Sequence, residues 1–178
     1  MEHSAPFEKL TKLDAAERQL RVAIRMFFER KDMIAIHTLA AASQGILQDL
    51  GRSKGFVSLF EQGAARIIPE KRKEVVRLFR QAQNFFKHAD RDQNTELAFF
   101  VDATKFYLLD AASLFVSITG RQIPETAALT AFFLVKYPHF FNLDDMPEFE
   151  RVKELAKRMN VDDFALILLG IDSLNSSS

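Results

Sequence analysis

Apolar residues recur along most of this chain at spacings of three and four, which is typical of amphipathic α-helices. Between Thr11 and Arg30, for example, Leu20, Ile24 and Phe28 fall on one side, and charged residues occupy the other. No segment shows the strict alternation of apolar and polar residues that indicates a half-buried strand. The pattern predicts an all-α protein, with seven or eight helices in a single domain that spans residues 1–178.

Capping and helix-breaking residues place the ends of these helices. Asp32 and Asp102 are the expected N-caps of two helices. Gly51, Gly120 and Asn160 are expected to stop the helices that precede them. The predicted helices run from Thr11 or Asp14 to Arg30, Met33 to Leu50, Phe56 to Ile67, Pro69 to Ala89, Ala103 to Thr119, Pro124 to Tyr137, Pro147 to Met159, and Asp162 or Asp163 to Leu174. Residues 1–10 and 175–178 are expected to be frayed.

The helix predicted at 33–50 has no typical solvated face. Opposite Ile36 and Leu47 it carries small or uncharged residues, among them His37 and Gln44. Small residues on a helix allow neighbouring helices to approach closely, and residues 40–42 are all alanine. We therefore expect this helix to lie at the centre of the bundle.

Two segments, 106–116 and 127–135, are apolar on most sides. A helix that is apolar all round is either buried within the bundle or packed against another surface. The sequence leaves both alternatives open. The second alternative would make the chain a homodimer.

Composition excludes several classes of function. The chain has 178 residues with 18 Phe, 2 Tyr, no Trp and no Cys. Disulfides, thiolate metal sites and thiol catalysis are therefore excluded. Lys plus Arg equals Asp plus Glu at 24 each. A chain without net charge has no domain-wide electrostatic field, and it is not expected to coat nucleic acid or an anionic membrane.

No targeting or cofactor-binding segment stands out. Met1 to Lys12 lacks the apolar stretch of a secretory signal, and no run of residues is long and apolar enough for a membrane span. The expected location is the cytoplasm, with no membrane partner. The glycine-rich loops that bind nucleotide phosphates are missing, so no cofactor is predicted.

Polar residues that could bind a ligand or act in catalysis are concentrated in the segment 80–94. On a helix, Arg80, Asn84 and His88 are one turn apart and form a line, and Lys87 and Arg91 lie on the same side. The line offers a fixed cation, a carboxamide and an imidazole that titrates near neutral pH. These groups could bind a phosphate, or place a general base beside a cation for RNA cleavage.

A structural interpretation competes with this functional one. Polar residues opposite an apolar stripe are usually a solvated face, and cations in a last helical turn favour the helix dipole. The acids of the segment 90–96 resemble the start of a calcium loop. Thr95 and Val101 stand where that loop needs Gly and Glu, so turn chemistry explains the acids better.

His37 also has two interpretations. It is either a core histidine bonded to a neighbouring helix or one half of a site shared with His88. Asp90 or Asp92 could complete the shared site as metal ligands or catalytic groups. No HExxH pair exists, and no metal site is favoured.

Residues 35–42 and 84–92, followed by Tyr137-Pro138, resemble a family of uncharacterised bacterial helical proteins. More distantly, Asn84-x-x-Lys87-His88 resembles the HEPN superfamily of helical domains. The superfamily resemblance implies a helical fold. Some members are metal-independent ribonucleases of toxin and defence systems that act as dimers across a shared cleft, and many others are non-catalytic binding modules.

The ribonuclease signature is an Arg followed closely by His. Here seven residues separate Arg80 from His88, Gln81 follows the Arg, and Asn84 stands where a nearer Arg is expected.

Three functional hypotheses follow. The first is a non-catalytic module that binds RNA, a protein or a small ligand through a polar face on helices 33–50 and 69–89. Its expected contact residues are His37, Gln44, Lys87 and Arg91. The alternative is a HEPN-like ribonuclease that uses His88, Arg80 and Asn84. A second alternative is a metal-dependent enzyme that uses histidine and aspartate.

Overall fold

The computed structural model describes residues 7–65, 68–88, 94–138, 158 and 160–176. These residues contain seven α-helices and no strand, which confirms the predicted all-α class. The helices are α1 (Lys12–Phe28), α2 (Met33–Arg52), α3 (Leu59–Ala65), α4 (Pro69–Phe85), α5 (Ala103–Thr119), α6 (Pro124–Lys136) and α8 (Val161–Ser176). The helix predicted at 147–159 lies outside the described residues, Arg158 excepted. α8 extends to Ser176, so residues 175 and 176 are helical and not frayed as predicted.

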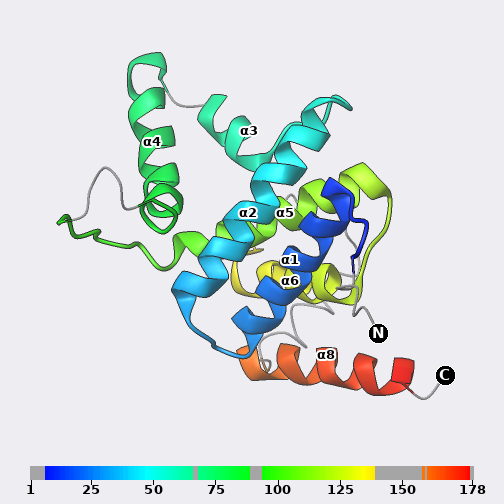
Figure 1. Ribbon diagram of the computed structural model, residues 1–178. Helices are drawn as coiled ribbons and strands as arrows, with labels where there is room; N and C mark the ends of the chain where they lie inside the picture. Colours follow the sequence, from blue (N-terminus) through cyan, green and yellow to red (C-terminus); the bar gives the residue numbers. More distant parts are fainter. Residues whose placement is uncertain (1–6, 66–67, 89–93, 139–157, 159, 177–178) are drawn as a thin grey trace, which may run out of the picture.

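α2 is the central helix of the bundle, as its sequence predicts. It packs mainly against α1 and α5, and α6 and α8 complete the core around α1 (Figure 1). α3 and α4 lie together at one side of α2, away from α8. The fully buried side chains include Leu20, Ile24, Phe28, Ile36, Leu47, Leu108, Phe115, Leu129, Phe133 and Phe164. Burying so many large apolar side chains is the main source of stability for such a bundle.

Gly51 does not stop α2, contrary to prediction. The helix continues to Arg52, and Gly51 is a buried residue within its last turn. A Cβ at this position would lie 3.3 Å from Leu114 Cδ2 on α5. Gly51 is therefore the point where α2 and α5 approach closely. The chain turns later, at Gly55, whose φ of 82° is in the left-handed region that favours glycine.

Capping contacts refine the predicted ends of other helices. α3 begins at Leu59, later than Phe56, because Ser58 and Glu61 form a capping box: Glu61 N donates to Ser58 Oγ at 3.0 Å, and Ser58 N donates to Glu61 Oε2 at 3.3 Å. The side chain of Asp102 accepts no capping bond, although α5 starts as expected. Asn160 caps α8, since its Oδ1 accepts from Asp162 N at 2.8 Å, and the helix that it was predicted to stop lies outside the described residues.

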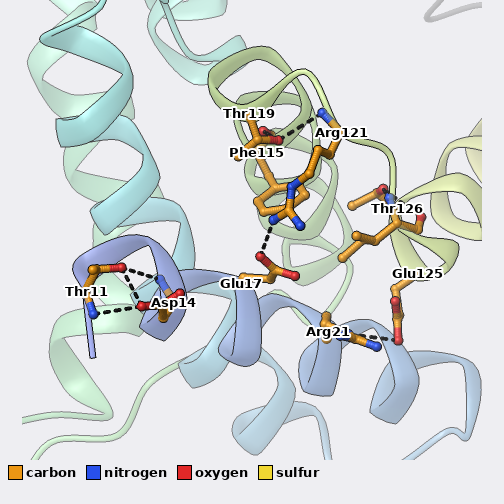
Figure 2. A network of polar contacts seen from close by, with 10 residues as sticks. Thr11, Asp14, Glu17, Arg21, Phe115, Thr119, Arg121, Glu125 and Thr126 are labelled. Carbon is orange, nitrogen blue, oxygen red and sulfur yellow. Dashed lines mark hydrogen bonds and ion pairs between the residues drawn. The ribbon is translucent and has the colours of Figure 1, made fainter. Parts of the chain in front are cut away.

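Polar contacts join α1 to the α5–α6 corner (Figure 2). Glu125 at the start of α6 is fully buried and accepts hydrogen bonds from Arg25 at 2.7 Å and from Arg21 at 3.3 Å. Arg121 reaches Glu17 of α1 at 2.6 Å. A buried carboxylate needs such partners, because an unpaired charge in the interior is costly.

Candidate functional site

A cavity of about 580 Å³ opens between α2, α3, α4 and α5. It brings together three residues that the sequence analysis singled out, Gln44 from α2 and Arg80 and Asn84 from α4. The lining residues are Gln44, Gly45, Gln48, Asp49, Leu59, Phe60, Gly63, Ala64, Val76, Arg80, Gln83, Asn84 and Tyr107. The cavity therefore combines a cation and several carboxamides with aromatic walls.

Arg80 is the one cation among the described residues that line the cavity. No residue in the described part of the chain forms an ion pair with its guanidinium. Its charge acts on Tyr107, a buried cavity residue of α5. Burial raises the pKa of Tyr107 to about 12, and the positive charge of Arg80 opposes this rise. The guanidinium thus lies close enough to the aromatic wall to influence it.

Asp110 lies behind the cavity and holds Gln44 in place. This carboxyl group is fully buried on α5, and it accepts from Gln44 Nε2 at 2.8 Å and from Leu59 N at 2.6 Å. Burial raises the pKa of Asp110, while the two hydrogen bonds oppose the rise. One side chain therefore connects α2, α5 and the first residue of α3.

The lining residue Asp49 belongs to a group of charged side chains on α2 and α3. Asp49 on α2 accepts through Oδ1 from Arg52 at 3.2 Å, and Arg52 also reaches Glu61 of α3 at 2.8 Å. The pKa of Glu61 is lowered, chiefly by its hydrogen bond with Arg52 and in part by one from Gln48. The α2 side of the cavity is thus rich in hydrogen-bond acceptors.

His37 belongs to the core and does not line this cavity. Its Nδ1 lies 3.0 Å from Thr104 Oγ1 on α5, and its ring makes edge contacts with Phe86, Phe99 and Tyr107. Burial lowers the pKa of His37 to about 4, and the charge of Lys87 contributes to the lowering. This geometry is that of a core histidine bonded to a neighbouring helix. Its Nε2 has no hydrogen-bond partner among the described residues.

α4 ends at Phe85 and not at Ala89, so His88, the last member of the line, follows the helix and is not within it as predicted. Lys87 and His88 follow in a turn where both backbone N–H groups donate to the carbonyl of Asn84. Both side chains are exposed, and neither lines the cavity. Only the first two members of the line are therefore part of the site.

The described residues contain no group of three His, Asp or Glu side chains that could hold a metal ion. His37 and His88 make no contact with one another in this part of the chain. Asp90, Arg91 and Asp92 lie outside the described residues. A metal site formed by His37, His88 and an aspartate therefore has no support in the described geometry.

A second cavity, of about 750 Å³, borders the outer face of α5. Phe106, Leu109 and Val116 line it, and the opposite face of the same helix is buried in the core. The apolar segment 106–116 is thus core on one side and cavity wall on the other. The homodimer stays a prediction.

Asp110 and Tyr107 are site residues that no motif indicated. Asp110 did carry a signal, because it is the single acidic residue in the apolar sequence of α5. A lone carboxylate in such a helix needs buried partners, which Gln44 and Leu59 supply. Tyr107 carried no comparable signal.

Comparison with protein-family models, curated proteins and solved structures finds no match to this chain. Within the described residues, no helix combines the length and the apolar character needed to span a bilayer.

Proposed function

We propose that this chain is a helical binding module, which takes a small ligand that bears an oxyanion into the cavity between α2, α3, α4 and α5. The observation that carries the proposal is the convergence of Gln44, Arg80 and Asn84 on one cavity of about 580 Å³. This volume lies within the range of small-molecule sites, which combine apolar walls with a few convergent polar groups.

The guanidinium of Arg80 forms no ion pair with any described residue, which supports an anionic ligand. Arginine presents a rigid fork of N–H donors that matches the oxygens of a carboxylate or phosphate. Asn84 adds a carboxamide one turn along the same helix. A ligand oxyanion would therefore find charge and directed hydrogen bonds on a single wall.

The other hypotheses receive less support. The ribonuclease hypothesis needs His88 beside Arg80, but His88 is exposed beyond the end of α4 and does not line the cavity. It stays a prediction. His37 and Lys87 are not needed by the proposal, because neither is among the described lining residues, and Arg91 lies outside the described residues.

Arg80→Gln tests the proposal. Titration of the purified chain with ethyl phosphate and with propionate, followed by calorimetry, should give binding at millimolar concentration that the variant weakens about tenfold or more, since a hydrogen bond to a charged group contributes about 1.5–3 kcal/mol. Arg77→Gln is the matched control, because Arg77 is an exposed cation on the same helix that does not line the cavity.

Two outcomes would contradict the proposed function. One is that neither probe, nor either amino-bearing probe introduced below, binds to the unchanged chain. The other is that Arg77→Gln weakens binding as much as Arg80→Gln does, because the anion would then respond to general surface charge and not to the cavity.

A further inference from the structure

Among the described lining residues, the two long walls of the cavity carry opposite charges. α4 supplies the cation Arg80, whereas α2 supplies Gln44, Gln48 and Asp49. A carboxamide can donate or accept, so the character of the α2 wall depends on how its amides are turned.

Asp110 fixes how the amide of Gln44 is turned. A carboxylate only accepts hydrogen bonds, and the NH₂ group is the only donor in a glutamine side chain. Leu59 N, a backbone donor, occupies Asp110 Oδ1, and Gln44 Nε2 occupies Oδ2. The amide nitrogen of Gln44 is thus committed to Asp110, and its carbonyl Oε1 remains as an acceptor.

Gln44 Oε1 has no hydrogen-bond partner among the described residues. It is not fully buried either. Because Gln44 lines the cavity, this oxygen is available to a ligand there. Asp49 lies on the same helix with one carboxylate oxygen engaged by Arg52 and the other without a partner in the described chain. The α2 wall therefore offers acceptors and a negative charge.

We propose that the ligand is a zwitterion whose oxyanion binds Arg80 and whose ammonium group binds Gln44 Oε1 and Asp49. Asp110 is a positioning residue, because it acts on the ligand through the orientation of Gln44. This inference rests on the proposed function and adds the ligand class to it.

Matched probes test the ammonium group separately from the oxyanion. Phosphoethanolamine and ethyl phosphate share a phosphate and differ in the amine, and β-alanine and propionate share a carboxylate in the same way. We expect each amino-bearing probe to bind about tenfold more tightly than its partner. The phosphate and carboxylate pairs then show which oxyanion the cavity prefers.

Asp110→Asn should abolish the selectivity for the amino-bearing probes. The side-chain oxygen of the new Asn must accept from Leu59 N, so its NH₂ group faces Gln44, and Gln44 must turn its carbonyl away from the cavity. The preference for phosphoethanolamine over ethyl phosphate should be lost while binding of ethyl phosphate persists. Adding Gln44→Glu to this variant returns an acceptor to the cavity and should restore the preference. A restored preference would show that the loss in Asp110→Asn is not caused by loss of structure.

Asp49→Asn covers the case in which the Asp110 variants fail to fold. Asp49 is exposed, so its replacement should leave the fold intact and reduce the preference for phosphoethanolamine several-fold. Equal binding of both members of each probe pair would overturn the zwitterion inference and leave the anion-binding function standing. An unchanged preference in Asp49→Asn and in every folded Asp110 variant would overturn the assigned residues as well.

Discussion

Burial shifts the two titratable groups nearest the α2–α5 contact in opposite directions. His37 has its pKa lowered to about 4, and the pKa of Asp110 is raised. Both shifts follow from the same cause, since a low-dielectric environment disfavours the charged form of either group. The folded chain therefore keeps His37 neutral at physiological pH.

His37→Gln tests this effect on stability. The imidazole takes up its proton near pH 6.5 when the chain is unfolded but only at about pH 4 when it is folded. The stabilisation is therefore present above pH 6.5 and is lost as the pH falls through 4. Between about pH 7 and pH 4 the unchanged chain should lose about 3 kcal/mol more unfolding free energy than His37→Gln, measured by denaturant titration.

His88→Gln serves as the control for this prediction, because the side chain of His88 is exposed. Its unfolding free energy should follow that of the unchanged chain across the same pH range. Parallel pH profiles for His37→Gln and the unchanged chain would contradict the prediction.

At the scale of single residues, sequence patterns could identify one part of the candidate site but not the other. Arg80 and Asn84 are one turn apart on an amphipathic helix, so their shared face follows from helical periodicity alone. The partnership of Gln44 with Asp110 joins residues 66 positions apart, and no local pattern encodes that distance. His37 was assignable to the core or to a site only after its neighbours on α5 were known.

At the scale of helices, buried ion pairs specify the register of neighbouring helices more narrowly than apolar packing alone. Glu125 is the clearest case, since it is fully buried at the start of α6 and bonded to Arg21 and Arg25 of α1. Such pairs fix the register of two helices. A shift of one helix along the other would separate the charges and leave the buried one without its partner.

Glu125→Gln should destabilise the chain by about 2 kcal/mol, because it leaves both arginines without their carboxylate. The expected drop in Tm in a calorimetric scan is about 5 °C for a chain of this size. Glu8→Gln is the control, since the Glu8–Arg18 pair is exposed and should contribute little. Equal effects of the two substitutions would contradict the role given to burial.

The sequence predicted the helix ends that are set by a capping residue, a proline or a glycine. Thr11 and Asp32 cap α1 and α2, Pro69 and Pro124 open α4 and α6, and Gly120 closes α5 with a φ of 66°. Gly51 misled the prediction because tertiary packing decides its role. Glycine can mark a helix end or a close helix contact, and the sequence alone does not separate the two.

At the scale of the molecule, the cavity lies beside the apolar core and shares Tyr107 with it. α1, α5, α6 and α8 surround the largest buried side chains, whereas α3 has no buried residue and α4 lies to the side of α2 (Figure 1). Substitutions in the cavity are therefore expected to affect binding more than folding. The lining residues Arg80 and Asn84 are exposed and are not part of that core.

The ribonuclease hypothesis makes a prediction about the whole assembly, because the resemblance implies a dimer with a shared cleft. Light scattering of the purified chain would then give twice its mass of 20.4 kDa, and RNA cleavage would be lost in His88→Ala. A monomer at micromolar concentration that leaves RNA intact would refute the hypothesis. It would not affect the binding function, which needs one copy of the cavity.

The hydrogen bond between Gln44 and Asp110 has an evolutionary consequence. An amide must face a carboxylate across this buried contact, so neither position can change freely without the other. We expect positions 44 and 110 to covary in descendants of this sequence, with the reversed pair of an acid at 44 and an amide at 110 as the neutral alternative. Lineages that replace both by apolar residues would lose the ligand and leave Leu59 N without its acceptor.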